Sequence, residues 1–232
     1  MRINAPARLA VAWLTMFLVG TELFVFSPLL PVLAADYHIA PSFAGLSVTM
    51  FSLAYMVSAP LFGYIADRIG RRRVLICSLL AFALANILTA GAANLLSLLA
   101  VRLFAGAAAA GVSPSIYALV GSAAPPDRRA TWLALVVSGL LVSLAIGASA
   151  GGLVGVLFGG PPVFLALAGL GLVLVWLNRW VWPCDHGAAA GLAAAARDPL
   201  AVVVLVRRLI PMVLWSTGLY GVYTYLGAGL AA

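Results

Sequence analysis

The sequence predicts an all-α integral membrane protein with a six-helix bundle followed by a seventh transmembrane helix. Hydrophobic residues make up 65% of the 232 residues and charged residues only 8%, and the mean hydropathy is +1.15. A water-soluble domain cannot bury so much apolar surface. The apolar residues fall into blocks of about 20, the length that crosses a hydrocarbon core of about 30 Å. We therefore expect the lipid bilayer to be the solvent of most of the chain.

Seven apolar blocks define the predicted spans. Blocks of this length must be helices, because lipid offers no hydrogen bonds to the backbone, and transmembrane β-strands are shorter and alternate in polarity. We place the spans at residues 9–33, 42–66, 74–92, 95–120, 132–157, 163–182 and 200–232. This division predicts a six-helix bundle over residues 1–182, a cytoplasmic linker over 183–199 and a seventh helix over 200–232.

The arginines predict the orientation of the bundle. The chain contains no lysine, so its net charge of +7 comes from arginine, and no arginine lies in the loops 34–41, 93–94 and 158–162. Arginines instead cluster at the N-terminus, at 68–73 and at 128–129. Because positively charged loops stay in the cytoplasm, we expect a cytoplasmic N-terminus. The same topology explains the basic charge without nucleic acid, since Arg71–Arg73 lie between two spans.

The sequence shows no pattern typical of an enzyme or a metal site. Cys77 and Cys184 lie far apart, and His38 and His186 have no second ligand pair nearby. There is no nucleotide-binding loop, haem motif or Ser/His/Asp set. We therefore predict that the protein is not an enzyme and uses no metal and no cofactor.

Two ionisable residues fall inside predicted spans. Glu22 lies about 20 Å from the cytoplasmic start of the first span at 1.5 Å per residue, and Arg102 lies at a similar level in the fourth. Such charges are costly unless they pair or face water, and neither has an opposite charge four residues away in its own helix. Glu22 is either a hydrogen-bonded structural residue or a proton-titrating site in a cavity. Arg102 is either a packing residue or part of the coupling machinery.

Small residues recur every four positions along the fifth span. This spacing places them on one helix face, where another backbone can approach closely. A contact groove and a flexible hinge both fit the pattern, and the strict spacing favours the groove. The residues of this helix-packing motif are Gly139, Ser143, Gly147, Gly151, Gly152 and Gly155, with Gly159 continuing the period.

Three motifs resemble those of the major facilitator superfamily. The segment GYIADRIGRRR is similar to its G-x-x-x-D-R-x-G-R-R signature between helices two and three, and Arg102, Gly106 and Gly111 resemble its R-x-x-x-G motif. The run from Gly147 to Gly152 resembles the antiporter motif G-P-x-x-G-G, although Ala148 replaces the proline. The first span resembles the bacterial drug and sugar efflux branch, the arabinose-efflux-like permeases. The signature residues are Gly63, Asp67, Arg68, Gly70, Arg71 and Arg72.

This resemblance implies proton-coupled efflux of a small molecule, a drug or a sugar, from a bacterial inner membrane by alternating access. Glu22 then carries the proton and the proton gradient supplies the energy. The signature loop acts as a cytoplasmic gate, a topology signal or both. Members of the superfamily have two six-helix bundles, so we expect this chain to be half of a transporter. It is then either a truncated product or fragment, or a half that pairs with a second half-transporter chain or with itself. The glycine face of the fifth span is then expected to contact a helix of the missing half. The alternative is a non-transporting, truncated or oligomerising membrane module.

Overall fold

A computed structural model describes residues 4–184 and, beyond them, residues 207, 210, 211, 214 and 218. Spatial clustering divides the chain into Met1–Gly187 and Ala188–Ala232. The predicted linker lies outside the described residues except for Pro183 and Cys184. The predicted seventh span does too, apart from five isolated helical positions. The first unit contains the predicted six-helix bundle.

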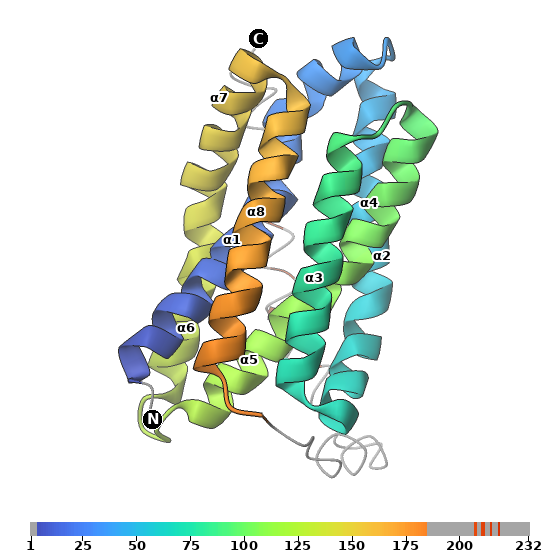
Figure 1. Cartoon of the computed structure of the whole chain (residues 1–232). Coiled ribbons are helices and arrows are strands. Elements are labelled where there is room, and N and C mark those ends of the chain that lie inside the picture. Colours follow the sequence, from blue (N-terminus) through green and yellow to red (C-terminus); the bar gives the residue numbers. More distant parts are fainter. Residues whose placement is uncertain (1–3, 185–206, 208–209, 212–213, 215–217, 219–232) are drawn as a thin grey trace. The chain divides into compact units, whose positions relative to one another are not determined.

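Within residues 4–184 the regular structure is entirely helical, and its helices form a bundle (Figure 1). In this described part of the chain, six helical segments are long and apolar enough to cross a membrane, which matches the six spans that the sequence predicts for residues 1–182. Helices α4 and α5 together make the fourth of these segments, and α6, the π-helix η1 and α7 together make the fifth. The bounds are α1 Ala5–Asp36, α2 Pro41–Ile69, α3 Arg71–Ala90, α4 Leu95–Ala110, α5 Val112–Ala123, α6 Arg129–Val142, η1 Ser143–Gly147, α7 Ala148–Phe158 and α8 Gly160–Val181.

The connection between α2 and α3 is much shorter than the sequence indicates. Asp67, Arg68 and the following arginines were expected in a loop, but α2 continues to Ile69 and α3 begins at Arg71. Gly70 alone is non-helical, with a φ of 105°. Residues with a Cβ atom rarely adopt this conformation, so glycine is needed at the turn. The two arginine-bearing helix ends are therefore held in a tight corner.

Helix α1 is the central helix of the bundle. It packs against α2, against α5 to α8 and against η1, and it buries Leu18, Phe26 and Leu29 completely. Helix α2 by contrast leaves Met56 and Val57 about two-thirds exposed at its surface. An apolar outer surface costs little in lipid, so α2 can leave these side chains exposed.

A polar network joins α1 to the end of α8. Asn178 Nδ2 donates a hydrogen bond to Thr15 Oγ1 at 3.0 Å, and Trp182 Nε1 donates to Asn178 Oδ1 at 3.0 Å. The guanidinium of Arg8 lies 5.9 Å from the centre of a Trp182 ring. The beginning of α1 and the end of α8 are therefore at the same end of the bundle, as six consecutive spans require.

The glycine face of the fifth span contacts α1. We expected this face to pack against a helix of a missing half, and that expectation is wrong for these residues because α1 of the same bundle occupies it. The Ser143 side chain packs against Gly20 of α1 and occupies the space that a Cβ atom at Gly20 would need. A Cβ atom would overlap α1 at Gly139 against Trp13, Gly147 against Thr21, Gly151 against Val25, Gly152 against Pro28 and Gly155 against Leu29.

The groove also contains a local irregularity. Residues Ser143–Gly147 form the π-helical turn η1, which faces Gly20 and Thr21 of α1. A π turn inserts an extra residue into an α-helix and is frequent at functional sites. The structure thus combines a tight contact groove with a non-ideal turn beside the segment of α1 that carries Glu22.

We predict that Gly139→Ala destabilises the bundle. A Cβ atom there would lie 2.5 Å from the carbonyl oxygen of Trp13, and a backbone atom in a packed helix cannot move aside cheaply. Overpacking of this kind costs about 1–3 kcal/mol. The midpoint of thermal unfolding, followed by tryptophan fluorescence in detergent, should fall.

Gly169→Ala is the matched control, because no atom lies within 4 Å of its Cβ position in α8. Its unfolding midpoint should equal or exceed that of the wild type, since alanine favours helix. Equal midpoints for the two variants would show that α1 does not need the glycine at 139.

Candidate functional site

Glu22 of α1 and Arg102 of α4 form an ion pair in the interior of the bundle. Arg102 Nη1 donates to Glu22 Oε1, and the side chains are 1% and 0% exposed, respectively. Each residue supplies the opposite charge that the other lacks within its own helix. Breaking a buried pair by removing one partner costs about 3–5 kcal/mol, so the pair constrains how α1 and α4 can move apart.

Two aromatic rings and a backbone carbonyl also hold the Arg102 guanidinium. Its central carbon lies 3.7 Å from the ring centre of Phe26 and 4.2 Å from that of Phe51. Arg102 Nε donates to the carbonyl oxygen of Ser47 at 3.5 Å. A desolvated cation–π contact contributes about 2 kcal/mol. Arg102 is thus held by groups from α1 and α2 as well as by Glu22.

Gly106 explains how α2 comes near enough to make these contacts. A Cβ atom at Gly106 would overlap the backbone carbonyl of Phe51, so any larger residue would push α2 away from α4. Gly106 lies one turn after Arg102, on the same face of α4. The spacing R-x-x-x-G therefore has a physical basis. The glycine allows α2 to approach α4, and the arginine can then contact Ser47 and Phe51 of α2.

Asn86 of α3 is a member of the site that the sequence reasoning missed. It is fully buried, its side chain neighbours the Glu22 carboxylate, and its Nδ2 donates to Phe82 O at 3.1 Å. Two buried oxygens, Glu22 Oε2 and Asn86 Oδ1, have no hydrogen-bond partner among the described residues. The sequence feature that could have identified Asn86 is a single amide within the apolar run LLAFALANILTA. It lies at a depth in its span similar to that of Glu22 and Arg102.

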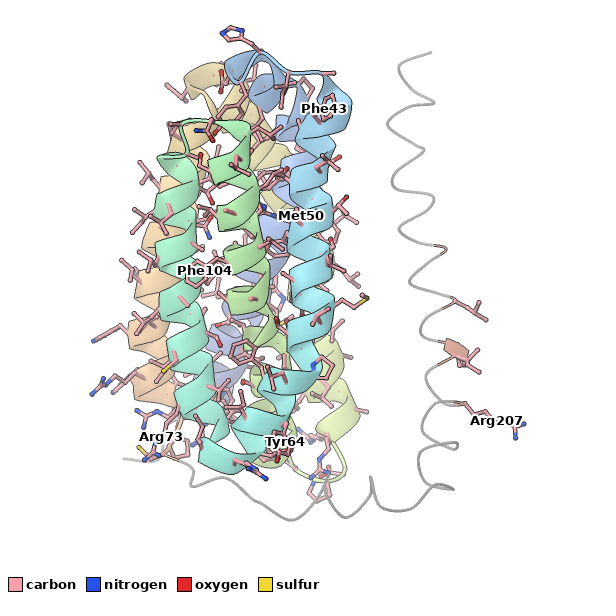
Figure 2. All side chains as sticks on the ribbon, turned by 90° about the vertical axis from the view of Figure 1, so that its right-hand side faces the viewer. Phe43, Met50, Tyr64, Arg73, Phe104 and Arg207 are labelled. Atoms are coloured by element: carbon pink, nitrogen blue, oxygen red, sulfur yellow. The ribbon has the colours of Figure 1, made fainter. Side chains whose placement is uncertain are left out.

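The signature residues gather at one end of the bundle, where α2 meets α3. Figure 2 places Tyr64 and Arg73 at this end and Phe43 at the opposite end of α2. Arg71 Nη2 lies 3.4 Å from Asp67 Oδ1. The two residues are four apart in the sequence and lie on either side of the corner at Gly70. Arg71 Nη1 also donates to the Ala118 carbonyl of α5 at 3.4 Å. The Asp67–Arg71 pair therefore connects α2, α3 and α5.

The other arginines of the signature contact different groups. Arg72 donates to the Arg179 carbonyl near the end of α8 and to the Cys184 sulfur. The Arg68 guanidinium lies 4.4 Å from the Tyr64 ring centre. Gly63 has no atom within 4 Å of its Cβ position, so no contact among the described residues requires glycine there. The signature thus ties four helix ends together within this one bundle.

The structure does not bring the three motifs into one site. Glu22 and Arg102 lie in the interior, the signature is at one end, and the glycine face joins α1 to the fifth span. The described residues contain no group of three His, Cys, Asp or Glu side chains able to hold a metal ion. The chemistry available at the interior site is therefore that of a carboxylate that can bind a proton beside a fixed cation.

The family model of the Major Facilitator Superfamily matches residues 12–231. The chain is 30% identical to YtbD of Bacillus subtilis, an uncharacterized MFS-type transporter, over 96% of this chain and 56% of the relative. It is 32% identical to a chloramphenicol resistance protein of Streptomyces lividans over 69% of this chain and 40% of the relative. A multi-drug resistance efflux pump, PmrA of Streptococcus pneumoniae, is 28% identical over 70% of this chain and 42% of the relative. The chain thus spans about half the length of these relatives.

We predict strong coupling between Glu22 and Arg102 in a double-mutant cycle. Arg102→Met and Glu22→Met each leave one buried charged or polar group without its partner, so each should lower stability by about 3–5 kcal/mol. The double variant leaves neither and should lose much less than the sum. Unfolding free energies in detergent measure all four proteins. Additive losses would mean that the two side chains do not interact in the folded protein.

Proposed function

The chain belongs to the Major Facilitator Superfamily, a family of multi-pass membrane transporters rather than enzymes, and we propose that it takes part in proton-coupled efflux of a small molecule. The proposed setting is a bacterial inner membrane. We propose that the N-terminus is cytoplasmic, because positively charged segments stay on the cytoplasmic side. The observation that supports proton coupling best is the fully buried Glu22–Arg102 pair.

Glu22 can take up a proton without releasing Arg102. Protonation neutralises the carboxylate and removes the charge attraction, but Phe26, Phe51 and the Ser47 carbonyl still hold the guanidinium. The Glu22 Oε1 atom can also still accept a hydrogen bond as a neutral carbonyl. Proton binding therefore weakens the link between α1 and α4 without leaving the cation unsolvated. Such a change biases one bundle conformation over another, which is what proton coupling requires.

We propose that the substrate is a small organic molecule of the kind handled by drug efflux proteins. The support is that the relatives of this chain include multidrug and chloramphenicol resistance proteins. Alternating access needs two bundles that rock about a midplane cavity. A second bundle, from another half-transporter chain or from a second copy, would complete the cavity.

The alternative is a non-transporting module that oligomerises through its glycine face. The structure gives this alternative less support than the sequence does, because α1 occupies that face. The exposed apolar surface of α2, which includes Met56 and Val57, is compatible with lipid or with another helix.

We predict gradient-dependent uptake of substrate into everted membrane vesicles from cells that express the chain. Labelled chloramphenicol and a panel of organic cations and other neutral drugs serve as substrates, with an imposed pH gradient. Glu22→Gln should abolish uptake, because glutamine has the shape of the acid but binds no proton. Asp36→Asn, at the outer end of the same helix, is the matched control and should transport normally. If wild-type vesicles show no gradient-dependent uptake, a second copy of the chain does not complete the transporter. If Glu22→Gln retains the uptake, the proposed proton role of Glu22 is wrong.

We predict that Asp67→Asn slows transport about tenfold without reducing membrane insertion. The substitution removes the charge-assisted contact with Arg71, and loss of such a bond is worth about 1.4 kcal/mol or more. Initial uptake rates should be divided by the amount of inserted protein. Asp127→Asn changes an exposed aspartate whose ion-pair partner in the described part of the chain is its neighbour Arg128 at 3.6 Å, so it should transport like the wild type. A wild-type rate for Asp67→Asn would leave topology as the whole role of the signature.

A further inference from the structure

A groove runs between α1 and α6 at the end of the bundle where both helices begin. Its volume is about 480 Å³, which is within the range of about 300–1,000 Å³ for small-molecule sites. Figure 1 shows the start of α1 beside α6 at this end. The groove contains neither the interior ion pair nor any residue of the signature. The residues that matter for its chemistry are Leu9, Ala10 and Trp13 from α1, and Arg128, Trp132 and Leu135 from α6 and its N-cap.

The groove opens where the small residues of the fifth span end. Gly139 lets α6 lie against the backbone of Trp13, since a Cβ atom there would be 2.5 Å from the Trp13 carbonyl oxygen. One turn earlier on the same face is Leu135, a large side chain that is 48% exposed. Trp13 Nε1 donates to Ser138 Oγ at 3.1 Å and joins the two helices at the deep end. The helices therefore touch at this level and leave open space toward their first residues.

The mouth of the groove carries positive charge, whereas its walls are apolar. Arg128 immediately precedes α6 and lines the groove, and Arg129 is the first residue of the helix. The Asp127 carboxylate lies 3.6 Å from Arg128 Nε, but the two side chains are 74% and 73% exposed, and such exposed pairs contribute little. A guanidinium has five N–H donors, so one carboxylate does not use them all. Two arginines and one aspartate leave the mouth with a net positive charge.

The two helix starts add to this positive field. Neither α1 nor α6 has an acidic residue in its first turn, and neither N-cap side chain accepts a backbone hydrogen bond. The aligned peptide dipoles make the start of a helix partly positive. Arg8, the cation in the first turn of α1, lies beside Trp182 and not in the groove. The charge at the mouth therefore favours an anionic group next to Arg128.

We propose that the groove binds an acyl chain of an anionic phospholipid whose phosphate lies at Arg128. A phospholipid has its charge at the membrane interface and its chains toward the midplane. The groove presents Arg128, Trp132 and Leu135 in the same order along one helix face, and tryptophan is typical of the interface. These residues span about two helical turns, roughly 11 Å, so the groove holds the headgroup end of the chain. An apolar protein helix would fill the groove but would leave Arg128 without an anionic partner.

Tryptophan quenching in vesicles tests the proposal, which does not depend on the proposed transport activity. The full chain is reconstituted in phosphatidylcholine vesicles that contain a minor fraction of either dibrominated phosphatidylglycerol or dibrominated phosphatidylcholine. The part of the quenching that is lost in Trp132→Phe reports the groove. For this part, the apparent affinity of the anionic bromolipid should be about fivefold higher, because one arginine near the surface contributes that much.

Arg128→Gln should remove this preference, so that the two bromolipids quench equally. Arg128 is exposed, so the substitution does not disturb packing. Arg73→Gln is the charge-matched control, because Arg73 is exposed at the same end of the bundle (Figure 2) and its Nη1 donates to the Ile69 carbonyl. This variant should keep the preference. Equal losses in the two variants would indicate a general attraction of lipid to the basic end and would contradict a site in the groove.

Ala10→Phe tests the apolar part of the site. The ring should fill the groove and reduce the Trp132 quenching by both bromolipids. Ala150→Phe makes the same change at an exposed alanine of α7, outside the groove, and should leave the quenching unchanged. If Ala10→Phe has no effect, the acyl chain does not enter the groove.

The wild type alone can also overturn the proposal. If neither bromolipid quenches Trp132, protein rather than lipid covers the groove. If both quench it equally, the groove does not select an anionic headgroup. Either result would show that the groove is not an anionic phospholipid site.

Discussion

The buried ion pair between Glu22 and Arg102 is the interaction on which the rest of the bundle depends. Charges at this depth are too costly to leave alone, so α1 and α4 must face each other, and α2 and α3 must close around them. The rings of Phe26 and Phe51 and the Ser47 carbonyl complete the surroundings of the arginine. Among the described residues, the two buried charged side chains therefore lie together, where a single proton can change the charge balance.

Close helix contacts make that arrangement possible. Gly106 allows α2 to approach α4 near the arginine, and the glycine face of the fifth span allows α1 to lie deep in the bundle. Association of helices in lipid has no hydrophobic drive, so van der Waals contact across small residues must hold them. The same residues that make the packing tight also place Glu22 beside the π turn η1. Stability and the chemistry of the site thus share one structural cause.

The signature residues at the α2–α3 corner link helices at one end of the bundle rather than in its interior. Its side chains join the ends of α2, α3, α5 and α8 within the bundle through Asp67, Arg71 and Arg72. An outward-facing basic loop would leave these groups in water, where single ion pairs contribute little. The Arg179 carbonyl lies in the last turn of α8, where it has no donor within its own helix, so it is a better partner for Arg72. The corner can therefore hold the helices of one bundle as a unit.

The sequence by itself determined the class of the fold and the number of described spans, because block length, apolar composition and arginine placement are properties of the chain in lipid. It also identified Glu22 and Arg102, since an isolated charge in an apolar run is visible without coordinates. It could not show that the two pair with each other, that Asn86 joins them, or that α1 rather than an absent helix fills the glycine groove. Those facts depend on which helix faces which, and only the packing of whole helices decides that.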